Sequence, residues 1–458
     1  MIASSVAMNE RPADRISFEA AQSAVIDGVG VLPSETVPLR EALGRVIRQD
    51  VVCDTDCPSV DVSAVDGYGF ASQSAAGASR AVPVTLRIVV TVKAGAIPVM
   101  SLGEGECAAI MTGGPLPAGS DTVVAAEDIQ ARGDLVVVTS PAPSGACVTR
   151  RGDFARTGET LGLAGRRATA QVLGALAAFG ATTVSVSRRP RLGILATGDE
   201  LVGCEAIPEL GCVRASNLPM LAALASDIGC DVVDIAIGRD REDELARQIE
   251  RWETFAAIII SGGVSTGKFD LVPGALRAVG AEIVFSDIRM RPGGRTIFAR
   301  KRDSAFFCLP GSPIGAMVAF LMIARPGLLA MMASSAAVPT PFWLRTTARL
   351  DKEWTLTAGC AYGGGEVGAN AETSGRTTGL RGRAARTWFV PARCVQSNRD
   401  KGLWVEPLAG HGVRGALVLA RVTCLIRIDE KTQSVEPNQM VDVFMLQTDG
   451  SLTGAAGI

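Results

Sequence analysis

Residues 191–200 read RLGILATGDE, an apolar run that ends in a threonine, a glycine and two carboxylates. Comparable runs begin at Ala256, where the sequence reads AAIIISGG, and at Phe306, where it reads FFCLPGSP. Short apolar runs bounded by glycine or proline are typical of strands buried on both faces of a parallel sheet. Helix-like segments separate these runs, so the alternation predicts a doubly wound α/β domain over residues 188–335.

The helix-like segments carry start signals. LPMLAALASDIG follows Ser216 and Asn217, either of which can cap a helix. Asp240 precedes EDELARQIERW and Asp270 precedes LVPGALRAVG, so each aspartate stands where an N-cap residue is expected. Both aspartates also lie at or just past predicted strand ends. A capping role and a ligand-binding role are therefore both open for these carboxylates.

The flanking regions are mainly of β type. Residues 17–28 predict a short helix with Ser17 as its N-cap. The valine-rich stretch 54–143 contains VPVTLRIVVTVKAG and two further strand patterns around a Gly-Asp turn, which predict an inserted β domain. After residue 340, ALVLARVTCLIRID and MVDVFML predict strands of a small C-terminal β domain.

Composition excludes several classes of chemistry. The 458 residues include 45 Lys plus Arg, 47 Asp plus Glu and a single histidine, His411. A net charge of −2 argues against nucleic acid as the main partner, and one histidine argues against His-ligated zinc and Ser-His-Asp catalysis. The eleven cysteines include no CxxC pair, and charged residues precede any hydrophobic core of signal-peptide length. The apolar run 314–324 is followed by Arg325-Pro326, which we expect to end it too soon for a membrane span. These features predict a cytoplasmic protein with free thiols.

Three turns after predicted strands are candidates for binding phosphate. Glycines let backbone N–H groups approach an anion closely, and hydroxyls add further donors. Carboxylates beside a phosphate would repel it unless a hard cation such as Mg²⁺ lay between them. An ordinary glycine turn and ordinary caps are the alternatives. The predicted binding residues for the phosphorylated ligand are Thr197, Gly198, Ser261, Gly262, Gly263, Ser265, Pro310, Gly311 and Ser312, and the predicted magnesium ligands are Glu200, Asp240 and Asp270.

Further polar clusters lie outside these turns. Asp66 stands in the turn SAVDGYG, and Thr112 opens the turn TGGPLP. Arg150 and Arg151 precede Gly152-Asp153, and three arginines at 289, 291 and 295 surround Pro292-Gly293-Gly294. Guanidinium groups suit phosphate because their forked donors match its oxygens. These arginines therefore predict either anion binding or a solvated surface.

Seven blocks in this order resemble the molybdopterin molybdenumtransferase family, the MoeA and gephyrin E-domain type. They are SAVDGYGF, IMTGGPLPAGSDTVVAAED, ILATGDELV, RASNLPML, SGGVSTGKFD, RMRPGG and LPGSPIGA. The resemblance covers nearly the whole chain and loosens after about residue 340. The resemblance implies insertion of molybdate into adenylylated molybdopterin with Mg²⁺, releasing AMP and the molybdenum cofactor. It also implies a homodimer whose active site joins both subunits. The charge balance and the length of the apolar runs predict no nucleic acid or membrane partner. A cofactor-biosynthesis protein or a molybdoenzyme is a possible further partner.

The resemblance also implies a domain plan and catalytic residues. The plan is a split linker and dimerisation domain (1–53 and 144–187), an inserted β domain (54–143), a molybdopterin-binding α/β domain (188–335) and a C-terminal β domain (336–458). By block position, Asp66, Thr112, Arg291 and Arg386 match the family's catalytic positions, and Asp153 is the catalytic carboxylate expected beside position 154.

The chain departs from the family pattern at several positions in or near the implied binding site. Residues 152–159 read GDFARTGE where the family has GEDIRxGE, so Phe154 replaces its second acidic residue. Either Phe154 packs against the neighbouring strands while Asp153 supplies the carboxylate, or the site is degraded. The lysine of the family's PGKP is missing, and Arg295 is expected to restore the charge and bind the cofactor. LPGNP reads LPGSP, and Arg414 stands where the family has a serine. A non-catalytic carrier of molybdopterin or of the finished cofactor is therefore the alternative function.

Overall fold

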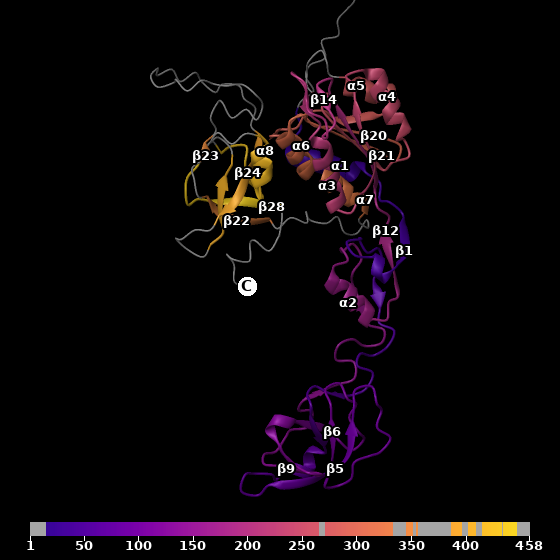
Figure 1. Ribbon diagram of the computed structural model, residues 1–458, viewed down its shortest axis with the longest axis vertical. Coiled ribbons are helices and arrows are strands. Elements are labelled where there is room, and N and C mark those ends of the chain that lie inside the picture. The colour runs from indigo at the N-terminus through magenta and orange to yellow at the C-terminus, as the bar shows by residue number, and fades with distance from the viewer. Residues whose placement is uncertain are drawn as a thin grey trace, which may run out of the picture. The chain divides into compact units, whose positions relative to one another are not determined.

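The computed structural model divides the chain into two compact units, each described here by itself (Figure 1). The first unit comprises Met1–Glu35, Gly44–Val46 and Ser187–Ile458, and the second unit comprises Thr36–Leu43 and Ile47–Val186. The four-part division expected from the sequence stays a prediction. The residues that the structure describes are 15–264, 271–332, 345–350, 354–355, 386–395, 402–408, 415–432 and 434–446.

A six-stranded sheet forms the centre of the first unit. Its strand order is β16-β13-β17-β21-β20-β18, and the first four strands are parallel. Strand β20 runs antiparallel to both of its neighbours, so β18 has the same direction as the first four strands. The parallel part matches the sequence prediction, and the reversed strand β20 and the edge strand β18 extend it. The bounds are β13 (Arg191–Thr197), β16 (Asp231–Gly238), β17 (Ala257–Ser261), β18 (Glu282–Phe285), β20 (Ile297–Lys301) and β21 (Ser304–Leu309), with a short ladder of β14 (Leu201–Val202) and β15 (Val213–Arg214) after β13.

Helices cover both faces of this sheet (Figure 1). Ile258 and Ile260 of β17 point into the core beneath α4 and α5, while Ile259 points into the core on the other face. Alternate side chains of one strand are thus buried on opposite sides, which confirms the doubly wound arrangement. The bounds of the covering helices are α1 (Phe18–Gly28), α3 (Asn217–Asp227), α4 (Glu242–Arg251), α5 (Val272–Ala278), α6 (Pro313–Ala319), the π-helical segment η4 (Phe320–Ala324) and α7 (Arg325–Met332).

The helix starts differ in part from the predicted caps. Ser17 caps α1 as expected, since its hydroxyl accepts from the backbone N–H of Ala20 at 3.1 Å. Helix α3 begins at Asn217 with Ser216 at its N-cap position, but neither side chain caps it. Helix α4 has Arg241 at its N-cap position, so the capping role considered for Asp240 is wrong.

The prediction that Arg325-Pro326 ends the apolar helix is also wrong. A continuous helix runs from Pro313 to Met332, and it is long and apolar enough to span a membrane, but 94% of its most apolar window is buried inside the protein. Proline lacks an N–H and crowds the carbonyl four residues earlier. The π-helical turn lies directly before Pro326, and the side-chain amide of Gln22 donates to the Met322 carbonyl at 2.9 Å. A partner from α1 thus pairs the carbonyl that the proline leaves without its helical donor.

The C-terminal part of the first unit contains a second six-stranded sheet, in the order β19-β24-β25-β22-β28-β26. Strand β24 also pairs with β26, so the sheet closes on itself. The strand predicted over ALVLAR is wrong, because residues 415–421 form helix α8, which packs against α6 and β24. The bounds are β19 (Met290–Arg291), β22 (Arg345–Leu350), β24 (Thr387–Val395), β25 (Trp404–Pro407), α8 (Gly415–Arg421), β26 (Cys424–Ile428) and β28 (Met440–Met445), beside a ladder of β23 (Trp354–Thr355) and β27 (Ser434–Val435).

The second unit is built around a sheet in the order β7-β4-β6-β5-β9-β8. Strands β8 and β9 form the predicted hairpin around Gly133-Asp134, where Gly133 has a φ of 61° that favours glycine. The cysteines in the described part of the chain are free thiols, as expected. The remaining bounds are β1 (Ser34–Pro38), η1 (Leu39–Glu41), β2 (Val51–Val52), β3 (Val62–Ser63), β4 (Gly67–Phe70), η2 (Ser72–Ala75), β5 (Val84–Val92), β6 (Glu106–Ile110), β7 (Thr122–Ala125), η3 (Ala126–Asp128), β8 (Gln130–Arg132), β9 (Leu135–Val138), β10 (Val148–Thr149), β11 (Thr160–Leu161), α2 (Ala170–Ala178) and β12 (Thr183–Ser187).

Loss of the Gln22 amide should destabilise the first unit. We expect Gln22→Ala to lower its free energy of unfolding by about 1–3 kcal/mol, because the Met322 carbonyl loses its partner inside the protein. All five tryptophans lie in the first unit, so urea unfolding followed by tryptophan fluorescence reports on it. Ser23→Ala, at an exposed position of the same helix, is the control. Equal unfolding midpoints for the two variants would contradict this account.

Candidate functional site

The turns after β13, β17 and β21 lie against one another at the carboxyl edge of the central sheet. The backbone N–H of Gly262 donates to the Leu309 carbonyl at 3.0 Å. A Cβ on Gly262 would lie 2.4 Å from the Thr197 carbonyl oxygen, and one on Gly311 would lie 3.6 Å from the Gly262 Cα. The structure therefore brings together the three turns singled out in the sequence. Ser265, in the second of them, lies outside the described residues.

The glycines of the second turn are required by this packing. Gly262 and Gly263 have φ values of 102° and 63°, which side chains rarely adopt. A Cβ on Gly263 would also lie 2.8 Å from a methyl group of Val272. Glycine is needed here whatever the turn binds, so a valine at either position would disrupt the fold as well as any ligand contact.

Asn217 joins two of the turns. Its side-chain nitrogen Nδ2 donates to the hydroxyl of Ser261 and to the carbonyl of Gly311, both at 2.8 Å. The Ser261 hydroxyl in turn donates to the Pro310 carbonyl at 3.2 Å. Asn217 is 7% exposed, and its Oδ1 has no hydrogen-bond partner among the described residues. The sequence indicated only a cap at this position, because nothing local reveals contacts with two distant turns.

Two of the three predicted magnesium ligands lie beside the first turn. Asp240 accepts a hydrogen bond from the Thr197 hydroxyl at 2.8 Å. The Glu200 carboxylate lies over Gly198, since a Cβ there would be 2.5 Å from its Oε2. Asp270 lies outside the described residues, and within the described part of the chain no group of three or more acidic, Cys or His side chains is placed to hold a metal. The triplet stays a prediction.

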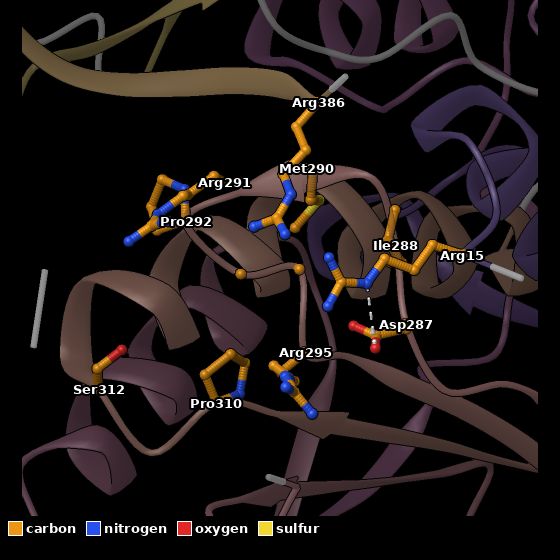
Figure 2. Close-up of a pocket in the computed structure, with 12 residues that line it drawn as sticks. Arg15, Asp287, Ile288, Met290, Arg291, Pro292, Arg295, Pro310, Ser312 and Arg386 are labelled. Atoms are coloured by element: carbon orange, nitrogen blue, oxygen red, sulfur yellow. Dashed lines mark ion pairs between the residues drawn. The ribbon is translucent and has the colours of Figure 1, made fainter. Parts of the chain in front are cut away.

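An arginine-lined cavity of about 290 Å³ lies next to the third turn. Figure 2 shows the guanidinium groups of Arg15 and Arg386 pointing into it, with Arg295 and Pro310 on the opposite side. Five residues predicted from the sequence meet here, namely Arg291, Arg295, Pro310, Ser312 and Arg386. Sequence reasoning missed Arg15 and Asp287, which also line the cavity.

Strand pairing places the arginines of this cavity. β19, which contains Arg291, pairs in parallel with the start of β24, directly after Arg386. The Arg291 guanidinium lies over the Trp388 ring at 5.6 Å from its centre, a cation–π contact that helps to hold it. The pairing thus joins two arginines that are far apart in the sequence into one positively charged wall.

The second unit brings Asp66 and Thr112 together. The backbone N–H and the hydroxyl of Thr112 both donate to Asp66 Oδ1, at 2.6 and 2.8 Å. These two bonds, the backbone bond most of all, hold the pKa of Asp66 below its usual value. Asp66 is therefore an exposed carboxylate that is fixed in direction and ionised at neutral pH.

Arg150 and Arg151 are paired with carboxylates within the second unit. Arg150 donates to Asp61 at 2.8 Å, and Arg151 donates through Nε to Asp56 at 2.5 Å. Hydrogen bonds from the Thr157 backbone and from Arg151 lower the pKa of Asp56 to about 2. The pairing favours a structural role for these arginines over the phosphate-binding role considered from the sequence.

The loop at the main departure from the family pattern exposes its aromatic ring. The Phe154 side chain is 73% exposed, so the interpretation that it packs against neighbouring strands is wrong. Asp153 is also exposed, and its Oδ2 accepts from the Arg150 backbone N–H at 2.7 Å. Asp153 therefore closes the turn 150–153 and presents a carboxylate at the surface next to Phe154.

Two family models match the chain. Residues 16–180 match the MoeA N-terminal region, domains I and II, and residues 193–330 match a probable molybdopterin-binding domain. Among solved structures, a molybdopterin biosynthesis MoeA protein from Pyrococcus horikoshii is similar, with a TM-score of 0.74 at 21% identity over 94% of this chain and 100% of that chain. The similarity to this structure supports the predicted multidomain α/β fold.

Relatives of known name are similar over most of their length. The molybdopterin molybdenumtransferase of Staphylococcus aureus is 26% identical over 95% of this chain and 97% of its own. That of Synechococcus elongatus is 33% identical over 337 residues, which are 72% of this chain and 83% of its own. At this identity and coverage, the chain belongs to the molybdopterin molybdenumtransferase family.

Proposed function

We propose that this protein catalyses the insertion of molybdate into adenylylated molybdopterin, with release of AMP and the molybdenum cofactor. Its membership of the family supports this reaction over the non-catalytic carrier. Hydroxyl, carboxylate and guanidinium groups supply the chemistry, which requires no histidine. The protein is proposed to act in the cytoplasm.

The observation that carries the proposal is the arginine-lined cavity beside the 310–312 turn. Four guanidinium groups and one carboxylate line it, so its formal charge is strongly positive. Molybdate is a small tetrahedral dianion, and guanidinium groups bind such oxyanions through paired charge-assisted hydrogen bonds. The adjoining turns, fixed by Asn217, would hold the phosphate of the pterin next to the bound oxyanion.

Complementation tests this function. In a strain that lacks its own molybdenumtransferase, expression of the chain should restore molybdoenzyme activity at ordinary molybdate concentrations. Arg386→Gln should restore it only at raised molybdate, because it weakens the oxyanion site without removing the pterin site. Failure of the unaltered chain at every molybdate concentration, with tight cofactor binding retained, would establish the carrier function instead.

We propose that Mg²⁺ is held by Glu200 and Asp240, with Asp270 as third ligand. The donor set fits this ion, since carboxylate oxygens are the ligands it prefers, and the two described carboxylates flank the same Thr197-Gly198 turn. When bound, Mg²⁺ would neutralise phosphate charge and assist the departure of AMP. The hydrogen bond from the Thr197 hydroxyl orients the Asp240 carboxylate.

Neutralising these carboxylates should therefore affect turnover and not folding. Glu200→Gln, Asp240→Asn and Asp270→Asn should each lose most of the magnesium-dependent turnover. Asp240→Asn should change stability by less than about 0.5 kcal/mol, because Asp240 caps no helix and asparagine still accepts from Thr197. Asp243→Asn, an exposed carboxylate on α4, is the control for both readouts. Full turnover in Asp240→Asn would remove it from the metal site.

We propose that Asp153 supplies the carboxylate that Phe154 lacks. Asp153→Ala should then lower the insertion rate at least about ten-fold, since a carboxylate placed in an active site typically contributes that much or more. Phe154→Asp should change the rate little, and Asp134→Ala, at an exposed hairpin turn, should leave it unchanged. A rise of ten-fold or more in Phe154→Asp with no effect of Asp153→Ala would show a degraded site.

We further propose that the protein is a homodimer, as the family resemblance implies. Light scattering at micromolar concentration should give twice the chain mass of 47.5 kDa. A mass of one chain at this concentration would remove the shared active site from the account.

A further inference from the structure

We propose that Arg15 is a further oxyanion-binding residue of the arginine-lined cavity and sets its preference for dianions. This inference rests on the proposed function and adds to it a residue from a distant part of the sequence. Arg15 stands ahead of the first helix, outside every block that pointed to the family. Its side chain nevertheless lines the same cavity as Arg291, Arg295 and Arg386.

The backbone directly after Arg15 is held to the wall of the cavity. Ile16 pairs in parallel with Ile288, its N–H donating to the Asp287 carbonyl at 3.3 Å. The Arg289 N–H donates to the Ile16 carbonyl at 2.8 Å. Ile16 also packs against the core that contains Ile288. Arg15 therefore enters the cavity from an anchored segment, and its position does not depend on its own side chain.

Asp287 fixes the direction of the Arg15 guanidinium. Arg15 Nε lies 3.4 Å from Asp287 Oδ2, and the two side chains are 32% and 22% exposed. Because the carboxylate lies next to Nε, the two terminal nitrogens are left to face the cavity, as Figure 2 shows. A guanidinium that is held at one edge presents its remaining donors in a fixed fork, which suits a tetrahedral oxyanion.

The formal charge of the residues that line the cavity accounts for its preference for dianions over monoanions. Among the residues that line this cavity of about 290 Å³, four are arginines and one is an aspartate, so their formal charges sum to about +3. A dianion gains from this excess twice as much Coulomb energy as a monoanion at the same place. Without Arg15, Asp287 would face the anion unpaired and would oppose its binding. Arg15 thus both adds donors and neutralises the one group in the cavity that repels the ligand.

A purely structural role for the ion pair predicts something different. Partly exposed ion pairs contribute little to stability, and the backbone bonds of Ile16 remain in any Arg15 variant. If the pair only attached the N-terminal segment, its loss would change stability slightly and would leave anion affinity unchanged.

Calorimetric titration of the full-length protein distinguishes the two roles. Molybdate alone and inorganic phosphate alone are the probes, since the oxyanion in the cavity is either free molybdate or the phosphate of the pterin substrate. Arg15→Gln should weaken the binding of at least one of them by roughly ten- to hundred-fold, with at most a slight shift in melting temperature. Arg15→Lys keeps the charge but loses the fork and should fall between. In turnover, Arg15→Gln should leave kcat unchanged. It should raise KM for molybdate if molybdate binding is weakened, or KM for the adenylylated pterin if phosphate binding is weakened.

Two further variants show whether a negative result concerns Arg15 alone or the whole proposed oxyanion site. Arg300→Gln removes another arginine that is paired with a carboxylate, Glu282, but lies outside the cavity, and it should bind both anions like the unaltered protein. Arg386→Gln should weaken binding if the cavity is the oxyanion site at all. Unaltered affinity in Arg15→Gln beside weakened affinity in Arg386→Gln would overturn the role of Arg15 alone. No effect of either variant would overturn the proposed oxyanion site, and the inference with it.

Discussion

The carboxamide of Asn217 holds together the ends of two parallel strands, and the candidate site depends on that junction. Its two N–H groups bind the Ser261 hydroxyl after β17 and the Gly311 carbonyl after β21. Because the residue is buried, each of these bonds lies where water does not compete for it. The turns are thereby fixed against each other and against Thr197, and the third turn forms one side of the arginine-lined cavity.

Local charge, and not the charge of the whole chain, indicates what the site binds. The chain is close to neutral, yet four guanidinium groups from three separate stretches of sequence line one small cavity. Arg150 and Arg151, by contrast, are balanced by Asp61 and Asp56. Arginines therefore differ in role according to their place in the fold, and Arg15, Arg291, Arg295 and Arg386 line one shared cavity.

The parts of the fold that depend on local pattern could be predicted from the sequence. The buried runs gave the parallel strands, and Ser17 and Gly133 marked a helix start and a hairpin turn. Features set by distant partners could not be predicted. The Gln22 amide pairs the Met322 carbonyl, so the apolar helix continues beyond Pro326. The pairing of Ile16 with Ile288 places Arg15 at the cavity. Asn217 binds two turns instead of capping α3. The apolar run that forms α8 was ambiguous because short runs show no clear period.

In the proposed reaction, molybdate binding in the arginine-lined cavity is coupled to cleavage of the adenylylated pterin. The most direct measurement is AMP release by the purified protein, loaded with adenylylated molybdopterin and Mg²⁺, as molybdate is added. AMP release should depend on molybdate and saturate, and it should require at least about ten-fold more molybdate in Arg386→Gln. Retention of AMP at every molybdate concentration, with the pterin still bound, would contradict this coupling.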